Sequence, residues 1–258
     1  MIKFFRKIRY NLMEQNKTGK YLEYAIGEIV LVVIGILIAL SINNWNENNK
    51  KEVIEIQFLE TLIADLKSDT IYFNRRIKDS KNEIDNYQLY VKRAYEEQNT
   101  TDDFKKLIGL VDYNSEHFVF QNSTYLELIN AGQLGIFKNR ELKNNIIALY
   151  KNYNIKEAHI REFNDFSSDY LKKTELTTFK YYEFLGGNLE KDIPNFYDKS
   201  EWSFINDRSS YKFRILEEIA LLYMDKHNLF KNYFVEMKMN STQLIIDINA
   251  ELVRRNND

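Results

Sequence analysis

The chain has 258 residues with a net charge of −2, one proline and no cysteine. The absence of cysteine excludes disulfides, zinc–thiolate sites and thiol chemistry, and the mildly acidic balance argues against nucleic acid as a partner. The single proline and few glycines favour long helices over a turn-rich β fold, in a chain long enough for one domain with its own core.

The first element is an apolar stretch at residues 25–42, which reads AIGEIVLVVIGILIALSI and carries one charge, Glu28. A helix needs about 20 such residues to cross the hydrocarbon core of a bilayer. We therefore predict a transmembrane helix over residues 24–45, with Tyr24 and Trp45 at its two interfaces.

Three small residues, Gly27, Gly35 and Ala39, are spaced at multiples of four within this helix and fall on one face. Small residues with this spacing permit close approach of two helices in a membrane. This face is the candidate contact with a second copy of the chain or with another envelope protein. The alternative is that these residues reflect the usual richness of membrane helices in glycine.

The orientation follows from the basic residues 1–23, which contain six Lys or Arg and two Glu. Because Lys and Arg are retained on the cytoplasmic side, residues 1–23 are predicted to be cytoplasmic and residues 46–258 to lie across the membrane. A cleaved signal peptide is the alternative, with Ala39-Leu40-Ser41 as a loose cleavage site. The apolar stretch is, however, longer than the usual 7–15 residues of a signal peptide.

Residues 50–98 have the rhythm of an amphipathic helix that continues the membrane span. Charged residues such as Asp69 and Arg76 lie between the stripe positions. The predicted stripe comprises Leu59, Leu62, Leu66, Thr70, Phe73, Ile77, Ser80, Ile84, Tyr87, Val91 and Ala94.

Shorter elements follow. Thr101 or Asp102 is expected to cap a short helix that ends near residue 111, and residues 117–120 look extended. A capping-box spacing starts another short helix at Thr124, and Gly132 is a suitable residue to end it.

Two further long helices are expected over residues 140–185, capped by Asn139, and 208–255. The loop 188–207 separates them. The predicted fold is all-α: the transmembrane helix is followed by an elongated antiparallel bundle of three long helices plus short ones, with shallow left-handed crossings. The first helix should lead away from the membrane, the second return, and the third lead away again.

Two stretches carry a resemblance to a known family. They are the block MIKFFRKIRYNLMEQNKTGKYLEYAIGEIVLVVIGILIALSINNWNE and the segment TYLELINAGQLGIFKNRELKNNIIALYKNY at residues 124–153. Both resemble an uncharacterised single-pass membrane-protein family of the Bacteroidetes, domain of unknown function 6090. The resemblance implies a Gram-negative envelope, hence the inner membrane and the periplasm, and it transfers no functional residues.

Catalytic and metal-binding motifs are absent from the sequence. His117, His159 and His227 are the three histidines, and none belongs to an HExxH motif. His159 and Glu162 lie one turn apart, but a di-iron bundle needs ExxH on two helices, so no metal or cofactor is expected. His227 falls on the apolar stripe of the last helix, where a hydrogen-bonded core histidine is favoured.

Two weaker signals remain. The irregular region 116–137 is either a binding loop or, as the capping signals favour, a helix–turn–helix corner. Asp69-Thr70-Ile71 resembles a periplasmic O-glycosylation acceptor of the Bacteroidetes, although Thr70 lies on the apolar stripe.

We therefore expect a non-catalytic inner-membrane protein that is not an enzyme and has no catalytic residues. Its partners would be the lipid bilayer and a second copy of itself, an envelope protein or a small ligand. The alternative is an envelope enzyme with an unrecognised active site, which would need a deep pocket with converging carboxylates or histidines.

Overall fold

The structure is a computed structural model that describes residues 6, 10, 18–96, 99–111, 114–173 and 199–257. These residues form helices and loops without any β-strand, which confirms the all-α prediction. The chain divides into two compact units, residues 1–57 and residues 58–258.

The longest element is α2 (Thr18–Ala94), a single helix of 77 residues. Its apolar segment is long enough to cross a membrane, and none of it is buried inside the structure. The helix continues without a break past Trp45, as expected for a stalk that continues the span. The boundaries at residues 23 and 45 stay predictions, and most of residues 1–17 lie outside the described residues.

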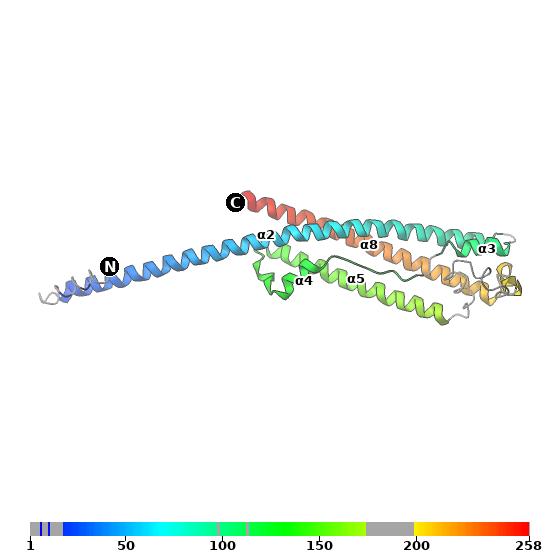
Figure 1. Cartoon of the computed structure of the whole chain (residues 1–258), viewed down its shortest axis with the longest axis horizontal. Coiled ribbons are helices and arrows are strands. Elements are labelled where there is room, and N and C mark those ends of the chain that lie inside the picture. The colour runs from blue at the N-terminus through cyan, green and yellow to red at the C-terminus, as the bar shows by residue number, and fades with distance from the viewer. Residues whose placement is uncertain are drawn as a thin grey trace, which may run out of the picture. The chain divides into compact units, whose positions relative to one another are not determined.

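The second unit contains the remaining helices (Figure 1). They are α3 (Thr101–Ile108), α4 (Ser123–Asn130), the 3-10 helix η1 (Gln133–Ile136), α5 (Arg140–Lys173), the 3-10 helix η2 (Lys199–Asn206) and α8 (Tyr211–Asn257). The predicted continuation of the second long helix to residue 185, and the Gly186-Gly187 and Pro194 positions after it, lie outside the described residues.

Local signals place several helix ends. The Asn139 side chain accepts a hydrogen bond from the Leu142 N–H at 3.1 Å, so the predicted cap of α5 is confirmed. Gly132 has φ 64°, a left-handed conformation that ends α4 at little cost for glycine. The cap of α3 is Thr100 rather than Thr101 or Asp102, because the Thr100 hydroxyl accepts the Asp103 N–H at 3.2 Å.

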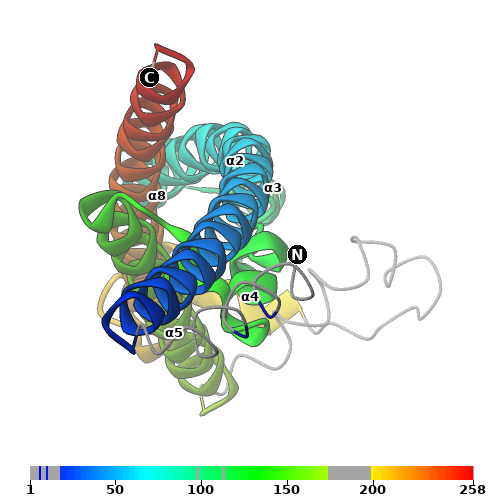
Figure 2. The ribbon, with the colours of Figure 1, turned by 90° about the vertical axis from the view of Figure 1, so that its left-hand side faces the viewer.

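The helices α5 and α8 pack side by side and run antiparallel (Figures 1 and 2). The Tyr170 hydroxyl donates to the Glu218 carboxylate at 2.7 Å near one end of the pair. At the other end, the Asn139 amide donates to the Glu251 carboxylate at 3.0 Å.

The same helix α8 is also antiparallel to α2. Lys238 donates to Asn74 at 2.8 Å, and the Tyr95 hydroxyl donates to Glu217 at 2.6 Å. Consequently α2 and α5 run in the same direction, and the expectation that each long helix reverses the previous one is wrong for this pair. The reason is that residues 114–122, which have no helical structure, carry the chain back along α2 before α5 begins.

The core of the second unit is rich in aromatic side chains. Phe73, Tyr153 and Phe234 come from α2, α5 and α8, are at most 1% exposed and pack ring against ring. A second cluster around Tyr87 and Tyr223 fills the region near α3. Edge-to-face and offset contacts of this kind contribute about 0.5–1.5 kcal/mol per pair beyond area burial.

Candidate functional site

The predicted membrane-contact residues Gly27, Gly35 and Ala39 are all exposed on α2. A Cβ atom added at Gly27 or Gly35 would meet no atom within 4 Å. These positions therefore stay candidates for a helix–helix contact, and none of the described residues lies against Gly27 or Gly35.

The three histidines do not meet. His117 is exposed, and His159 is exposed on α5 with its ring 6.1 Å from that of Tyr233. His227 is 2% exposed, which confirms its predicted place in the core, but neither ring nitrogen meets a hydrogen-bond partner of good geometry in the described structure. Among the described residues, no group of three or more His, Asp or Glu side chains is arranged to hold a metal ion.

The most distinctive feature of the second unit is the extended segment 114–122, here called the strap. Its backbone groups are bonded by helix side chains, since no neighbouring strand is available to them. The Asn164 side chain accepts the Glu116 N–H at 3.3 Å and donates to the Glu116 carbonyl at 2.6 Å. The Tyr72 hydroxyl donates to the His117 carbonyl at 2.9 Å.

The strap is also anchored at its start and along its apolar side. Lys226, which is fully buried, donates to the Asn114 carbonyl at 3.0 Å. Phe118 and Phe120 stack on each other at 5.2 Å and both lie edge-on to Tyr153. Thus region 116–137 is a structural connection inserted among three helices, and the predicted helix–turn–helix corner is confirmed only for its second half, α4 and η1.

Glu116 of the strap forms a half-buried polar cluster with Arg76 of α2 and His227 of α8. One carboxylate oxygen lies 2.5 Å from the Arg76 guanidinium, and the other lies 3.2 Å from Nδ1 of His227. Burial opposes ionisation of Glu116, but His227 and Arg76 outweigh it and lower the pKa of the carboxyl. The ion pair with Arg76 and the contact with His227 therefore hold the strap between α2 and α8.

A second carboxyl, Asp69 on α2, is 2% exposed and lies beside the strap. It accepts the Gln121 N–H at 2.8 Å, while its other oxygen has no hydrogen-bond partner in the described structure. Burial raises the pKa of Asp69 to about 7; the Gln121 N–H opposes this shift and the nearby Asp65 carboxylate adds to it. The buried Tyr150 hydroxyl also lacks a hydrogen-bond partner among the described residues.

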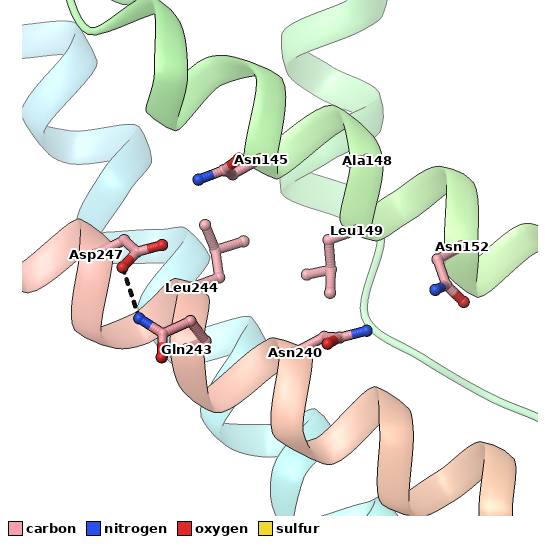
Figure 3. Close-up of a pocket in the computed structure, with 8 residues that line it drawn as sticks. All are labelled: Asn145, Ala148, Leu149, Asn152, Asn240, Gln243, Leu244 and Asp247. Carbon is pink, nitrogen blue, oxygen red and sulfur yellow. Dashed lines mark hydrogen bonds between the residues drawn. The ribbon is translucent and has the colours of Figure 1, made fainter.

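An open groove runs between α5 and α8 (Figure 3). Its volume is about 330 Å³, and Leu149 and Leu244 project into the space between the two helices. Side-chain amides and one carboxylate surround this apolar centre, with Gln243 donating to Asp247 at 2.8 Å. The polar lining residues are Asn145, Asn152, Asn240, Gln243 and Asp247.

These arrangements differ in what they can do chemically. The groove offers hydrogen-bonding amides and one carboxylate around an apolar centre, which are groups that can hold a ligand with polar and apolar parts. Asp69 is buried and the Glu116 cluster is half-buried, and both anchor the strap, which gives them a structural role in joining the helices.

Sequence reasoning assigned Asp69 and Arg76 to the charged face of α2 and overlooked Glu116. In the structure Asp69 is buried, whereas the predicted stripe residue Thr70 is only partly buried. One signal was available: Asp69 lies three residues after Leu66 and four before Phe73, which is the spacing of the stripe itself.

Comparison with models of known protein families identifies a family for this chain. Residues 28–193 match the model of a family of unknown function, DUF6090. No curated protein and no solved structure matches the chain. The matched residues include most of the apolar segment of α2, the strap and α5. The match covers more than half of the chain, and the protein therefore belongs to the DUF6090 family.

Proposed function

We propose that the protein is a single-pass inner-membrane protein whose residues 46–258 form a non-catalytic periplasmic domain with a scaffold or binding role. The observation that carries this proposal is the apolar segment of α2. Between residues 22 and 42, thirteen large apolar side chains are each 45–63% exposed. Such a continuous apolar surface is unfavourable in water and marks a membrane or protein contact.

The length and composition of the segment support the membrane over a protein partner. All sides of the helix are apolar, whereas docking to one protein groove needs a single apolar face. The basic residues 1–23 support an inside N-terminus.

The binding role rests on the second unit. Its core is closed by aromatic packing, and the groove between α5 and α8 presents amides on its surface. Three helices joined by a bonded strap give this surface a rigid frame, and binding groups on rigid elements are held more precisely than those on loops.

Two experiments test the proposal. Carbonate washing of cell membranes should leave the full chain in the pellet, while a variant without residues 25–42 should be released. Alkaline phosphatase fused after Asp258 should be active, and the same enzyme fused after Lys20 should be inactive. A soluble wild-type chain would refute the anchor. An inactive fusion after Asp258, with active enzyme after Lys20, would refute the orientation.

A further inference from the structure

Helix α8 carries two apolar stripes on opposite faces, and the bundle buries only one of them. The buried stripe includes Phe230, Phe234, Met237, Leu244 and Ile248, all at most 3% exposed. The second stripe, here called the outer stripe, faces away from the core. It comprises Val235, Met239, Thr242, Ile246, Asn249 and Val253.

The outer stripe has the spacing of a helix-pairing surface. Its members follow one another at steps of four, three, four, three and four residues, which is a heptad repeat of a and d positions. Met239, Ile246 and Val253 occupy the a positions and are 66%, 55% and 60% exposed. An amphipathic helix on the surface of a bundle requires only its inner stripe, so these apolar residues need another explanation.

The two polar members of the outer stripe are compatible with burial. The Thr242 hydroxyl donates to the Lys238 carbonyl at 2.8 Å, and the Asn249 amide donates to the Ile245 carbonyl at 2.8 Å. The Thr242 hydroxyl is thereby bonded within α8, whereas the second amide hydrogen and the oxygen of Asn249 would take partners from the second copy, such as its own Asn249.

We propose that the outer stripe is a self-association surface, on which α8 of a second copy of the chain packs in parallel and in register. The proposal rests on the membrane anchoring proposed above, because copies inserted with one topology share an orientation and are concentrated in the plane of the membrane. β-Branched residues at two of the three a positions, Ile246 and Val253, favour a two-stranded pairing.

The charges beside the stripe favour the same register. In a parallel pair, a g residue of one helix lies opposite the e residue five positions later in the other. Lys231 and Glu236 occupy these positions at the N-terminal edge of the contact. Glu236 also pairs with Lys156 of α5 at 2.8 Å, so Lys231 of the second copy would approach a carboxylate that already carries one ion pair. Towards the start of α8 the repeat becomes polar at Asn228 and Asn232, which limits the contact to the C-terminal half of the helix.

Cysteine crosslinking tests this geometry directly, because the chain has no cysteine of its own. The full chain would carry Met239→Cys or Ile246→Cys in isolated membranes under mild oxidation. The matched control is Asn240→Cys, which is also exposed but lines the groove beside α5. Crosslinked dimer should form about tenfold faster at the two stripe positions, because a disulfide requires Cα atoms within about 7 Å.

A second variant separates pairing from chance collision. Adding Ile246→Lys to the Met239→Cys chain should abolish the dimer, whereas adding Asn240→Lys should not. Three results would overturn the proposal. The crosslinking rates of Met239→Cys and Asn240→Cys could be equal, or Ile246→Lys could leave the crosslinked dimer unchanged. The mass of the crosslinked product could also show that it contains a different protein. If the protein stays in carbonate-washed membranes but forms no crosslinked dimer, self-association alone is refuted. If carbonate releases the protein from the membranes, the membrane anchor is refuted.

Discussion

Replacing Asp69 by Asn should stabilise the second unit above neutral pH. Asp69 is buried, its pKa is raised from 3.8 to about 7, and one of its oxygens has no hydrogen-bond partner in the described structure. The folded state therefore holds the Asp69 proton more tightly than the unfolded chain. Its contribution is most favourable below pH 4 and is lost as the pH rises to about 7.

The size of the effect follows from this pKa difference. At 1.36 kcal/mol per pH unit, the change from 3.8 to about 7 corresponds to about 4 kcal/mol. The neutral amide weakens the hydrogen bond from Gln121 by about 1 kcal/mol, since charge-assisted bonds are the stronger ones. We therefore expect Asp69→Asn to raise the free energy of unfolding by about 2–4 kcal/mol at pH 8 and by little at pH 4.

The assay is thermal unfolding of the full chain in detergent micelles, followed by circular dichroism at pH 4, 6 and 8. A gain of this size should raise Tm at pH 8 by about 4–16 °C for a domain of this length. Asp85→Asn, at an exposed position of the same helix, is the control and should change Tm little at any pH. If Asp69→Asn lowered Tm equally at all three pH values, the reasoning from burial would be refuted.

Three further predictions concern the packing of the second unit. Phe73→Ala removes a fully buried ring and should lower the free energy of unfolding by about 3–5 kcal/mol. The control Ile71→Ala, at a 74% exposed position, should change this free energy by less than about 0.5 kcal/mol. Chemical denaturation of the two variants measures the difference. Asn164→Ala removes both hydrogen bonds to the Glu116 backbone and should lower the free energy of unfolding by about 2–4 kcal/mol. Amide hydrogen exchange should become faster in the strap alone. Unchanged exchange in the strap would contradict the anchoring role of Asn164. The pKa of Glu251 is lowered to about 2, mainly by the hydrogen bond from Arg254. The stabilisation that the Glu251 carboxylate gives the fold is therefore present above pH 4.5 and is lost as the pH falls towards 2. Glu251→Gln should accordingly lower the Tm of the protein at pH 6 and leave it unchanged at pH 2.

Helix positions were predictable from the sequence because the period of apolar residues is a local property. Leu59 to Tyr87 on α2 and Leu216 to Ile248 on α8 follow that period, and most of the stripe residues are buried as expected. Gly132 and Asn139 were identified because turns and caps depend on a few neighbouring residues.

Helix direction and the buried charges were not predictable in this way. A stripe has the same spacing whether a helix runs up or down, and nothing local in residues 114–122 states that the segment returns along α2. The burial of Asp69 and Glu116 depends on partners that are distant in sequence, such as Gln121 and His227. The groove between α5 and α8 likewise exists only once the two helices are paired.

The pairing of α2 with α8 affects how the protein is made. Asn74 meets Lys238, which lies 164 residues later in the chain. During synthesis the apolar face of α2 therefore emerges long before α8, and until α8 is made only the strap and α5 can cover part of that face. Pairing between segments that are distant in sequence slows folding and leaves apolar surface exposed to aggregation. The nascent chain should consequently depend on a chaperone, and truncation within α8 should leave a product that aggregates rather than a smaller stable bundle.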